Sequence, residues 1–516
     1  MKDDPPKTHD DVPLEDRAGS IERGSMSKAV KIRDGDKALE AFASHTEDIT
    51  ITPEAEKKLL RKIDMNLMPI LCIVYALNFL DKTSLSYASI MGLQEDLHLK
   101  GTNYQWLGSM FYVGYLVWEY PTSYLLQRLP LAKWSSFNII MWGAVLCFMA
   151  PTKNFGGGLA VRFFLGVFEA AVSPGFALFT SQWYTREEQS ARTAIWFSFN
   201  GVAQIVGALI AYGIAINHPK REGETLASWQ ILFIAVGLIT VLVGVVFLYL
   251  MPDNQLNARF LTKEERLMAV ERIRKNQQGI GNSHFKKHQF VEAVTDPMTW
   301  AFVVFALLVN IPNGGITNFF SQLIVDFGYT PQQSLLYGTP GGAVEIVALV
   351  LSGYLGPRLK NRIFVSIPGL AVAMLGMLLI IALPLSMPVG RLIGYYLTQA
   401  FPTGFVALLS MLSSNVAGYT KKTTVGAMYF IAYCVGNLVG PQIFVPSTKP
   451  RYIPAEATIL ACWGLCILDL VFIRWYYKRE NTRKREQRVR DGFVAQDGQE
   501  FMDLTDRENP AFEYSL

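Results

Sequence analysis

The chain has 516 residues, of which 51% are hydrophobic and 17% charged, and its formal net charge is +4. A soluble chain of this length divides into domains whose helices or strands each show a polar face. Here apolar runs of about 20 residues recur instead, each long enough to cross a hydrocarbon layer of ~30 Å. The small net charge and the scattered basic residues argue against nucleic acid as a partner. The sequence therefore predicts an all-α polytopic membrane protein with the lipid bilayer as its main partner.

Polar and apolar segments alternate in a regular order along the chain. Residues 1–64 are polar and charged and predict a disordered N-terminal tail. Residues 65–251 and 297–477 each contain six apolar segments, which are separated by a polar central loop at 252–296 and followed by a charged C-terminal tail at 478–516. The predicted spans lie near 67–90, 104–126, 134–151, 158–183, 191–215, 229–251, 298–325, 333–357, 363–385, 388–415, 423–446 and 456–477. The plan is twelve transmembrane helices in two six-helix halves, with a binding site expected between the halves near the bilayer midplane.

The distribution of Lys and Arg predicts the orientation in the membrane. If both tails are cytoplasmic, the internal loops carry 17 of these residues and the external loops carry 7. The two tails add twelve and eight more. Short loops rich in Lys and Arg remain in the cytoplasm, so both termini are predicted to be cytoplasmic.

Several chemistries have no motif in this chain. The five cysteines all fall inside apolar runs, where a thiol behaves as a small hydrophobe. We find no zinc spacing, no phosphate-binding loop and no acyl-transfer nucleophile motif, and the Gly-rich stretch 338–342 reads as a helix break. The sequence therefore predicts no bound metal, no cofactor and no enzymatic activity, and transport would draw on a proton gradient rather than on ATP.

Ionisable residues inside the predicted spans are the main functional pointers. The first span carries Asp81 and Lys82, and the fourth carries Arg162 and Glu169 two turns apart on one helix face. Such groups cost about 2.5–3.5 kcal/mol each at the bilayer centre and normally face a cavity or a partner. One interpretation is structural, with Asp81 paired to Arg162 to lock two helices together. The other is functional: a cation binds an anionic solute while a desolvated carboxylate takes up a proton.

Further polar groups could line the same cavity. Glu119, Glu345 and Asp469 also lie in predicted spans, although the structural interpretation is favoured for these three. The polar and aromatic residues that could line a cavity are Asn78, Tyr112, Tyr115, Asn200, Gln204, Asn310, Asn313, Asn318, Gln322, Tyr429, Tyr433 and Asn437. Taken singly, each is as readily explained by interhelical hydrogen bonding. From these we take Asn78, Tyr115, Asn200, Gln204, Asn313 and Tyr433, together with Lys82 and Arg162, as candidate substrate-binding residues.

The central loop contains one predicted helix. Thr262 and Glu265 have the spacing of a capping box, and Leu261, Met268 and Ile273 lie close to one helix face. We expect a solvated or membrane-surface helix that ties the halves together, with a regulatory binding site as the alternative.

Three motifs carry a resemblance to a known family over about residues 60–480. They are Asn78-Phe79-Leu80-Asp81-Lys82, Gly114-Tyr115-Leu116-Val117-Trp118-Glu119-Tyr120-Pro121, and Arg162-Phe163-Phe164-Leu165-Gly166-Val167-Phe168-Glu169-Ala170 with Pro174-Gly175. The pattern resembles the major facilitator superfamily and, within it, the anion:cation symporter family, especially its fungal allantoate permease-like branch. The chain departs from the family at Lys82, where many relatives have Arg, and in the loop 123–128, which lacks the usual Asp.

The resemblance implies a rocker-switch carrier and assigns roles to the charged residues. Asp81 and Glu169 would take part in proton coupling, whereas Lys82 and Arg162 would attract the substrate carboxylate or hold the gate. The resulting prediction is a monomeric, proton-coupled importer of a small organic anion at the fungal plasma membrane, such as an allantoate-like ureide, a vitamin acid or another carboxylate. An exporter of an acidic secondary metabolite and a non-transporting nutrient sensor are the alternatives.

Overall fold

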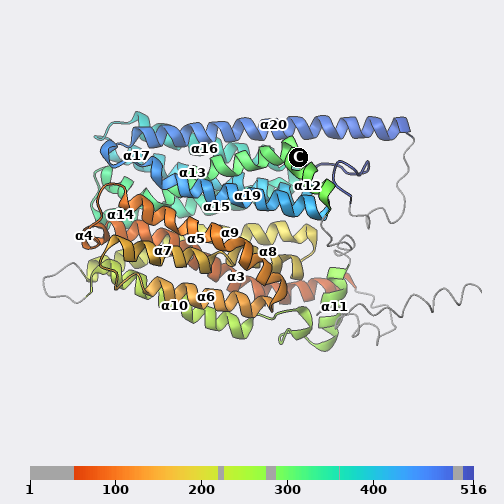
Figure 1. The fold of residues 1–516 in the computed structure, drawn as a ribbon, viewed down its shortest axis with the longest axis horizontal. Helices are drawn as coiled ribbons and strands as arrows, with labels where there is room; N and C mark the ends of the chain where they lie inside the picture. The colour runs from red at the N-terminus through yellow and green to blue at the C-terminus, as the bar shows by residue number, and fades with distance from the viewer. Residues whose placement is uncertain (1–51, 219–225, 275–285, 360, 492–503) are drawn as a thin grey trace, which may run out of the picture. The chain divides into compact units, whose positions relative to one another are not determined.

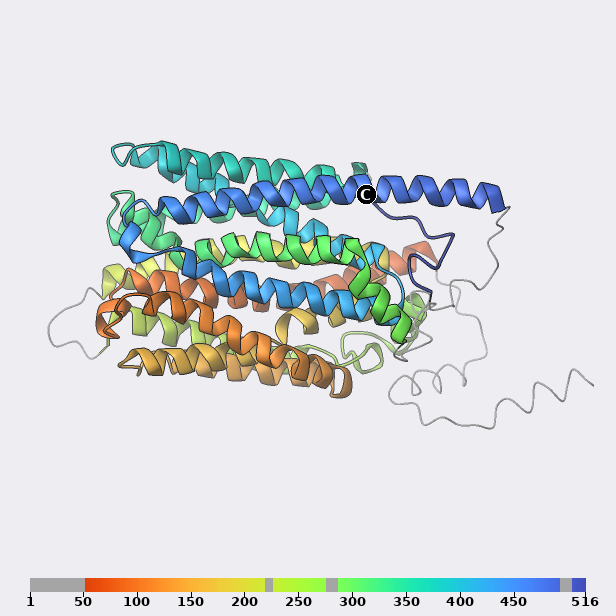
Figure 2. The same cartoon turned by 45° about the horizontal axis from the view of Figure 1, so that its top comes forward.

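The computed structural model describes residues 52–218, 226–274, 286–359, 361–491 and 504–516, and all regular secondary structure within these ranges is helical. Ten of the helical segments are long and apolar enough to cross a membrane. The described helices lie side by side as a bundle (Figure 1 and Figure 2). The predicted all-α membrane fold is therefore confirmed. The predicted disordered tail, 1–64, is too long, because residues 53–64 form the first turns of the helix Pro53–Ser89; residues 1–51 lie outside the described residues.

The twelve predicted spans correspond to the following helices. The N-terminal half comprises α3 (Pro53–Ser89), α5 (Asn103–Arg128), α6 (Leu131–Cys147), α7 (Phe155–Glu169) with α8 (Val172–Trp183), α9 (Arg186–Asn217) and α10 (Ser228–Leu250). The C-terminal half comprises α13 (Pro297–Asp326), α14 (Pro331–Tyr337) with α15 (Thr339–Leu359), α16 (Arg362–Ala382), α17 (Pro388–Thr398) with α18 (Pro402–Asn415), α19 (Tyr419–Val439) and α20 (Ile453–Asp491). Short helices stand in the connections, among them α4 (Leu93–Asp96) and the 3-10 turn η3 (Gly440–Ile443).

The two ends of the bundle differ in what they carry. At one end, here called the terminal end, α3 begins and α20 finishes (on the right in Figure 1). At the other, here called the far end, lie the connections 90–102, 148–154, 327–330, 383–387 and 440–452.

Prolines account for the interruptions within three spans. Each of Pro174, Pro340 and Pro402 lies close to the start of a helix that follows a break. A proline has no N–H for the carbonyl four residues earlier, and its ring clashes with that carbonyl. The break that the 338–342 stretch predicts is thus present between α14 and α15.

Glycines allow some helices to pack backbone against backbone. A Cβ added at Gly201 of α9 would overlap the carbonyl oxygen of Gly342 on α15, and one added at Gly342 would overlap the carbonyl oxygen of Gly201. Gly114 of α5 and Gly166 of α7 are in equally close contact with the facing backbone. Small residues let membrane helices approach this closely, so these contacts fix α9 against α15 and α5 against α7.

The central loop contains two helices that attach to different halves. In α11 (Lys263–Arg274) the capping box is confirmed, because Thr262 N–H donates to Glu265 Oε2 (2.9 Å) and Glu265 N–H donates to Thr262 Oγ1 (3.2 Å). Lys62 of α3 donates to the same Glu265 carboxylate at 2.6 Å, and this hydrogen bond lowers the pKa of Glu265. The other helix, α12 (Lys287–Thr295), bonds to α19 through Glu292 and Lys421 (2.9 Å). In the described residues the predicted loop helix is therefore anchored to the N-terminal half.

The end of the chain folds back onto the C-terminal half. Helix α20 continues to Asp491, and residues 504–516, here called the C-terminal strap, dock on its side. The ring of Tyr514 stacks on Tyr477 of α20 with centroids 4.6 Å apart. Asn481 bonds both the carbonyl and the N–H of Tyr514 at 2.9 Å, and Asn415 bonds both groups of Ser515 at 2.8 Å.

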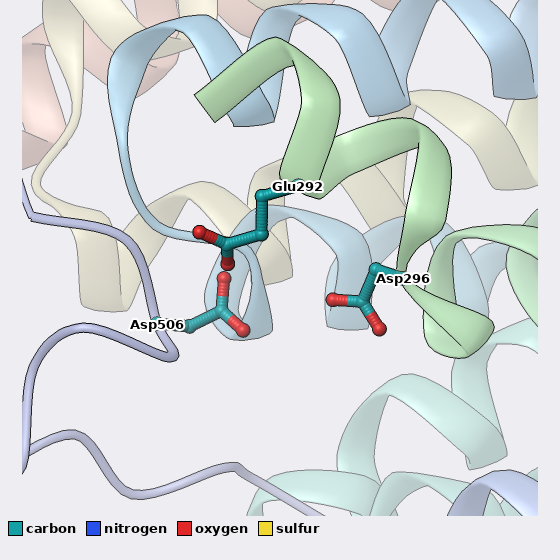
Figure 3. A group of neighbouring side chains, drawn as sticks. All are labelled: Glu292, Asp296 and Asp506. Atoms are coloured by element: carbon teal, nitrogen blue, oxygen red, sulfur yellow. The ribbon is translucent and has the colours of Figure 1, made fainter. Parts of the chain in front are cut away.

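Three carboxylates meet where the strap crosses the terminal end. Figure 3 shows Glu292 and Asp506 facing each other with Asp296 beside them. Lys421 Nζ lies 2.9 Å from Glu292 and 2.8 Å from each of the two aspartates, and Arg507 binds Asp296 at 2.8 Å. The ammonium group already holds the place that a bound cation would take, so the cluster is an ion-pair network.

Candidate functional site

The predicted proton-coupling residues come together in the N-terminal half. Asp81 lies on α3 and Glu169 is the last residue of α7, and both are fully buried. The two side chains lie within hydrogen-bonding reach of each other, so the two carboxyl groups could share a proton. Within the described part of the chain, Asp81 Oδ1 and Glu169 Oε2 are buried acceptors without a donor. One proton placed between the two carboxylates would satisfy both of these atoms.

Lys82 is the cation of this site. Its Nζ lies 2.6 Å from Glu169 Oε1 and donates to Asn78 Oδ1 at 2.7 Å. Asn78 Nδ2 in turn donates to Glu169 Oε1 at 2.7 Å. Asn78 and Lys82 are four residues apart on α3, so they lie on one helix face. In this conformation both are engaged with Glu169.

Asp81 has a partner that the sequence did not predict. Trp142 of α6 donates from Nε1 to Asp81 Oδ2 at 2.6 Å, and both side chains are fully buried. The ion pair that joins α3 to α7 is Lys82 with Glu169, whereas within the described residues no ion pair is found between Asp81 and Arg162, although the Arg162 charge acts on Asp81. Asp81 thus lies between Trp142 of α6 and Glu169 at the end of α7, and Lys82 also faces Glu169.

Arg162 keeps part of its donor capacity free. Its Nε donates to the Leu107 carbonyl at 3.1 Å, and its guanidinium lies over the Phe111 ring at 5.1 Å. Its Nη1 is buried and has no acceptor among the described residues. An Arg guanidinium has five donors and pairs readily with a carboxylate. The geometry therefore leaves a donor that a carboxylate ligand could use.

Of the remaining predicted substrate-binding residues, some contact the other half of the bundle and one bonds within its own half. Tyr115 of α5 faces Tyr433 of α19 across the halves, with ring centroids 6.4 Å apart. Gln204 of α9 also reaches across, because its Nε2 donates to the Tyr395 hydroxyl at 2.8 Å. Asn313, by contrast, donates to Asn437 at 2.7 Å within the C-terminal half, where it joins α13 to α19.

Asn200 belongs with Gln204. It lies one turn before Gln204 on α9 and is buried, and its Oδ1 has no donor among the described residues.

Of the three carboxylates favoured as structural, Glu119 accepts from Cys434 at 3.8 Å. Asp469 Oδ2 is buried without a donor in the described structure.

The far end of the bundle is closed by hydrogen bonds between the halves. Tyr104 Oη donates to the Asn318 carbonyl at 2.6 Å, and Gln105 donates to the Phe444 carbonyl at 2.8 Å. Ser109 donates to the Leu438 carbonyl at 2.6 Å. These bonds hold the two halves together at the far end in this conformation.

Sequence reasoning missed Trp142 and Phe111. A Trp or Phe inside an apolar run carries no signal of its own, since such residues are ordinary components of a span. Only the charges that they contact distinguish them.

A bundle of this kind, with buried charges facing one another between spans and the halves joined at one end, defines a polytopic membrane transporter. The sequence comparisons agree. The family model of the Major Facilitator Superfamily matches residues 71–441. The chain belongs to the Major Facilitator Superfamily.

Its relatives include fungal transporters. An uncharacterized transporter of Schizosaccharomyces pombe is 44% identical over 489 residues, which cover 93% of this chain and 94% of that protein. The allantoate permease of Saccharomyces cerevisiae is 38% identical over 501 residues, with coverage of 93% and 91%, and this similarity fits the allantoate permease-like branch. A thiamine pathway transporter of the same yeast is 34% identical, with coverage of 97% and 98%.

Solved structures share the fold at low identity. The xylose transporter XylE from E. coli, in a partially occluded inward-open conformation, matches with a TM-score of 0.59 at 13% identity, over 80% of this chain and 97% of that chain. A bacterial homolog of the human lysosomal transporter Spinster, inward-facing and occupied, matches with a TM-score of 0.57 at 16% identity, over 83% and 97%.

Proposed function

We propose that this protein imports a small organic anion together with protons by alternating access. The observation that supports the proposal is the group of four charges Asp81, Glu169, Lys82 and Arg162, of which all but the half-buried Lys82 are buried. With both carboxylates ionised the group is neutral, and with one proton shared between them it has a charge of +1. Because an uncompensated charge is costly in a low-dielectric interior, the protonated group would favour entry of an anion.

In this mechanism Arg162 and Lys82 bind the substrate carboxylate. Arg162 has a free buried donor, and a proton on Glu169 would loosen its ion pair with Lys82. Both cations would then be available to a substrate carboxylate. Release of the anion and of the proton on the other side would restore the Lys82–Glu169 pair, which couples the two fluxes.

The same proposal includes orientation and location. The excess of Lys and Arg at the terminal end supports a cytoplasmic position for that end and for both termini. The closed far end would then face outward, and the conformation described here would be the one that serves the cytoplasm. We place the protein in the plasma membrane as a monomer, with no cofactor besides the proton gradient. The similarity to an allantoate permease supports an allantoate-like ureide, a vitamin acid or another carboxylate as the substrate.

The test is uptake of labelled allantoate, nicotinate, pantothenate and biotin into yeast that expresses the chain, at pH 5 and 7.5, with and without a protonophore. We expect accumulation of one compound that is faster at pH 5 and collapses with the protonophore. Glu169→Gln should abolish accumulation while part of the exchange between labelled and unlabelled anion persists. Arg162→Ala should lose substrate binding.

A matched control and two contrary outcomes complete the test. Asp469→Asn removes a buried carboxylate on α20, outside the four-charge group, and should retain accumulation. Equal loss of accumulation and exchange in Glu169→Gln, with normal surface expression, would refute the coupling role. Absence of uptake of every compound by surface-expressed protein would favour the exporter, which predicts a higher intracellular level of product when the protein is deleted.

A further inference from the structure

The exposed faces of α16 and α20 form one apolar surface that the transport mechanism does not use. The two helices lie side by side in the bundle (Figure 1). Their exposed large apolar side chains recur mostly at intervals of three or four residues, which keeps them on one face of each helix. They are Phe364, Val372, Leu375 and Leu378 on α16 and Leu465, Leu468, Val471, Phe472 and Trp475 on α20. On a membrane-spanning bundle such a surface faces the acyl chains of the lipid, and it is here called the α16–α20 face.

Three cations lie where the α16–α20 face reaches the terminal end. The Arg474 guanidinium lies over the ring of Phe364, 5.1 Å from its centroid, and Phe364 is 62% exposed. The Arg479 guanidinium lies over the ring of Trp475 at 5.5 Å, and Trp475 is 54% exposed. Lys478 follows Arg474 by one turn of α20 and is also exposed. Exposed aromatic rings beside Arg and Lys at the end of a span mark the membrane–water interface, so the three cations lie at the level of the lipid headgroups.

The protein supplies no counter-ion for these three cations. In the part of the chain that the structure describes, Arg474, Lys478 and Arg479 form no ion pair and donate no side-chain hydrogen bond. The Nη1 atom of Arg474 is also buried, with no acceptor among these residues. Arg483, further along α20, differs because it binds Glu480 at 3.0 Å. The α16–α20 face therefore ends in a cluster of positive charge with unused donors.

An anionic phospholipid supplies both of the groups that this surface lacks. Its acyl chains cover apolar side chains, and its phosphate offers acceptor oxygens that a guanidinium binds through paired hydrogen bonds. We propose that the α16–α20 face, with Arg474, Lys478 and Arg479, is a binding site for an anionic phospholipid of the leaflet at the terminal end.

Two features of the site favour a lipid with a net negative charge. The Phe364 and Trp475 rings hold the two guanidinium groups by cation–π contacts, so the positive charge stays in place at the edge of the apolar face. Basic side chains at this position attract anionic lipids, whereas a choline headgroup would bring a further cation to the cluster. The inference does not depend on the transported solute or on the direction of transport.

The test compares two lipids that differ only in the headgroup. Dioleoylphosphatidylglycerol is anionic and dioleoylphosphatidylcholine is zwitterionic, and both have the same acyl chains and the same phosphodiester. Native mass spectrometry of the purified full chain in detergent gives the dissociation constant for the first bound molecule of each lipid. We expect the phosphatidylglycerol to bind about tenfold or more tightly, since each basic residue near an anionic lipid contributes about fivefold.

Variants at the terminal end of α20 separate this site from general attraction to charge. Arg474→Gln combined with Arg479→Gln should reduce the preference to about threefold or less. Lys478→Gln removes an exposed side chain and should reduce it by a smaller factor, which keeps the proposal testable if the double variant does not fold. The matched control is Arg483→Gln combined with Arg485→Gln. It removes the same charge from the same helix, but at guanidinium groups that already bind carboxylates of the protein, and it should keep the full preference.

Four outcomes would overturn the proposal and leave the proposed transport function untouched. The first is equal affinity of the wild-type protein for the two lipids, and the second is a full preference retained by the Arg474 and Arg479 double variant. The third is an equal loss of preference in the control double variant, because net charge rather than this surface would then attract the lipid. The fourth is displacement of the phosphatidylglycerol by an equal concentration of inorganic phosphate, which would assign the cations to a soluble phosphate.

Discussion

Replacing Gly201 by Ala tests the backbone contact between α9 and α15. The new methyl group would overlap the carbonyl oxygen of Gly342, which is main chain and has no side-chain freedom to move away. Overpacking of this kind costs about 1–3 kcal/mol. Ala also stabilises a helix relative to Gly by roughly 0.5–1 kcal/mol, so the variant alone would mix two opposing effects.

The same substitution at Gly213 removes that ambiguity. Gly213 lies on the same helix, and a Cβ added there meets nothing within 4 Å. The helix-propensity gain is common to both variants and cancels, so Gly201→Ala should be less stable than Gly213→Ala by about 1–3 kcal/mol. Apparent melting temperatures of the purified proteins in one detergent measure the order. If Gly201→Ala melts at or above Gly213→Ala, the helices do not pack backbone to backbone at this position.

Three other predictions concern single contacts. Trp142→Phe removes the Trp142 N–H that donates to the buried Asp81 carboxylate, and it should lower the free energy of unfolding by about 1–3 kcal/mol. The control is Trp134→Phe: Trp134 donates to Thr122 over a longer distance, 3.3 Å, so its loss should lower the melting temperature less than Trp142→Phe does. The pKa of Glu265 is lowered in the folded protein, so its stabilising pair with Lys62 is present at pH 7 and lost as the pH falls below about 4. Melting temperatures of the wild type and Glu265→Gln should therefore differ at pH 7 and converge below about pH 4. A difference that stays constant with pH would contradict a stabilising role for the Glu265–Lys62 pair. Tyr104→Phe weakens the far-end closure and should speed labelling of Ser321→Cys by a membrane-impermeant maleimide; an unchanged rate would show that this bond does not hold the end shut.

Local rules were sufficient to predict most of the fold. The span positions follow from the lengths of the apolar runs, the α14–α15 break follows from Pro340, and the start of α11 follows from Thr262 and Glu265. The docking of the C-terminal strap could not be predicted in the same way. It depends on contacts such as Tyr514 with Tyr477, between residues that are distant in sequence and ordinary in type.

The sequence was sufficient to predict which charged residues form the candidate site, but not which of them pair with each other. Asp81, Lys82, Arg162 and Glu169 stand out because charges are rare in apolar runs. Which of them pair depends on the rotation of α3 relative to α6 and α7, and the sequence does not encode that rotation in any short pattern.

The far-end closure consists largely of side chains that donate to main-chain carbonyls. Tyr104, Gln105 and Ser109 supply the donors, whereas Asn318, Phe444 and Leu438 contribute only their peptide oxygens. Substitution at one of these three acceptor positions leaves the peptide oxygen in place. Gln442 of the C-terminal half is different, because its side-chain Nε2 donates to Ser109 Oγ at 2.9 Å. In a mutational scan of this end, we therefore expect these hydrogen bonds to be lost through substitutions on α5 and at Gln442.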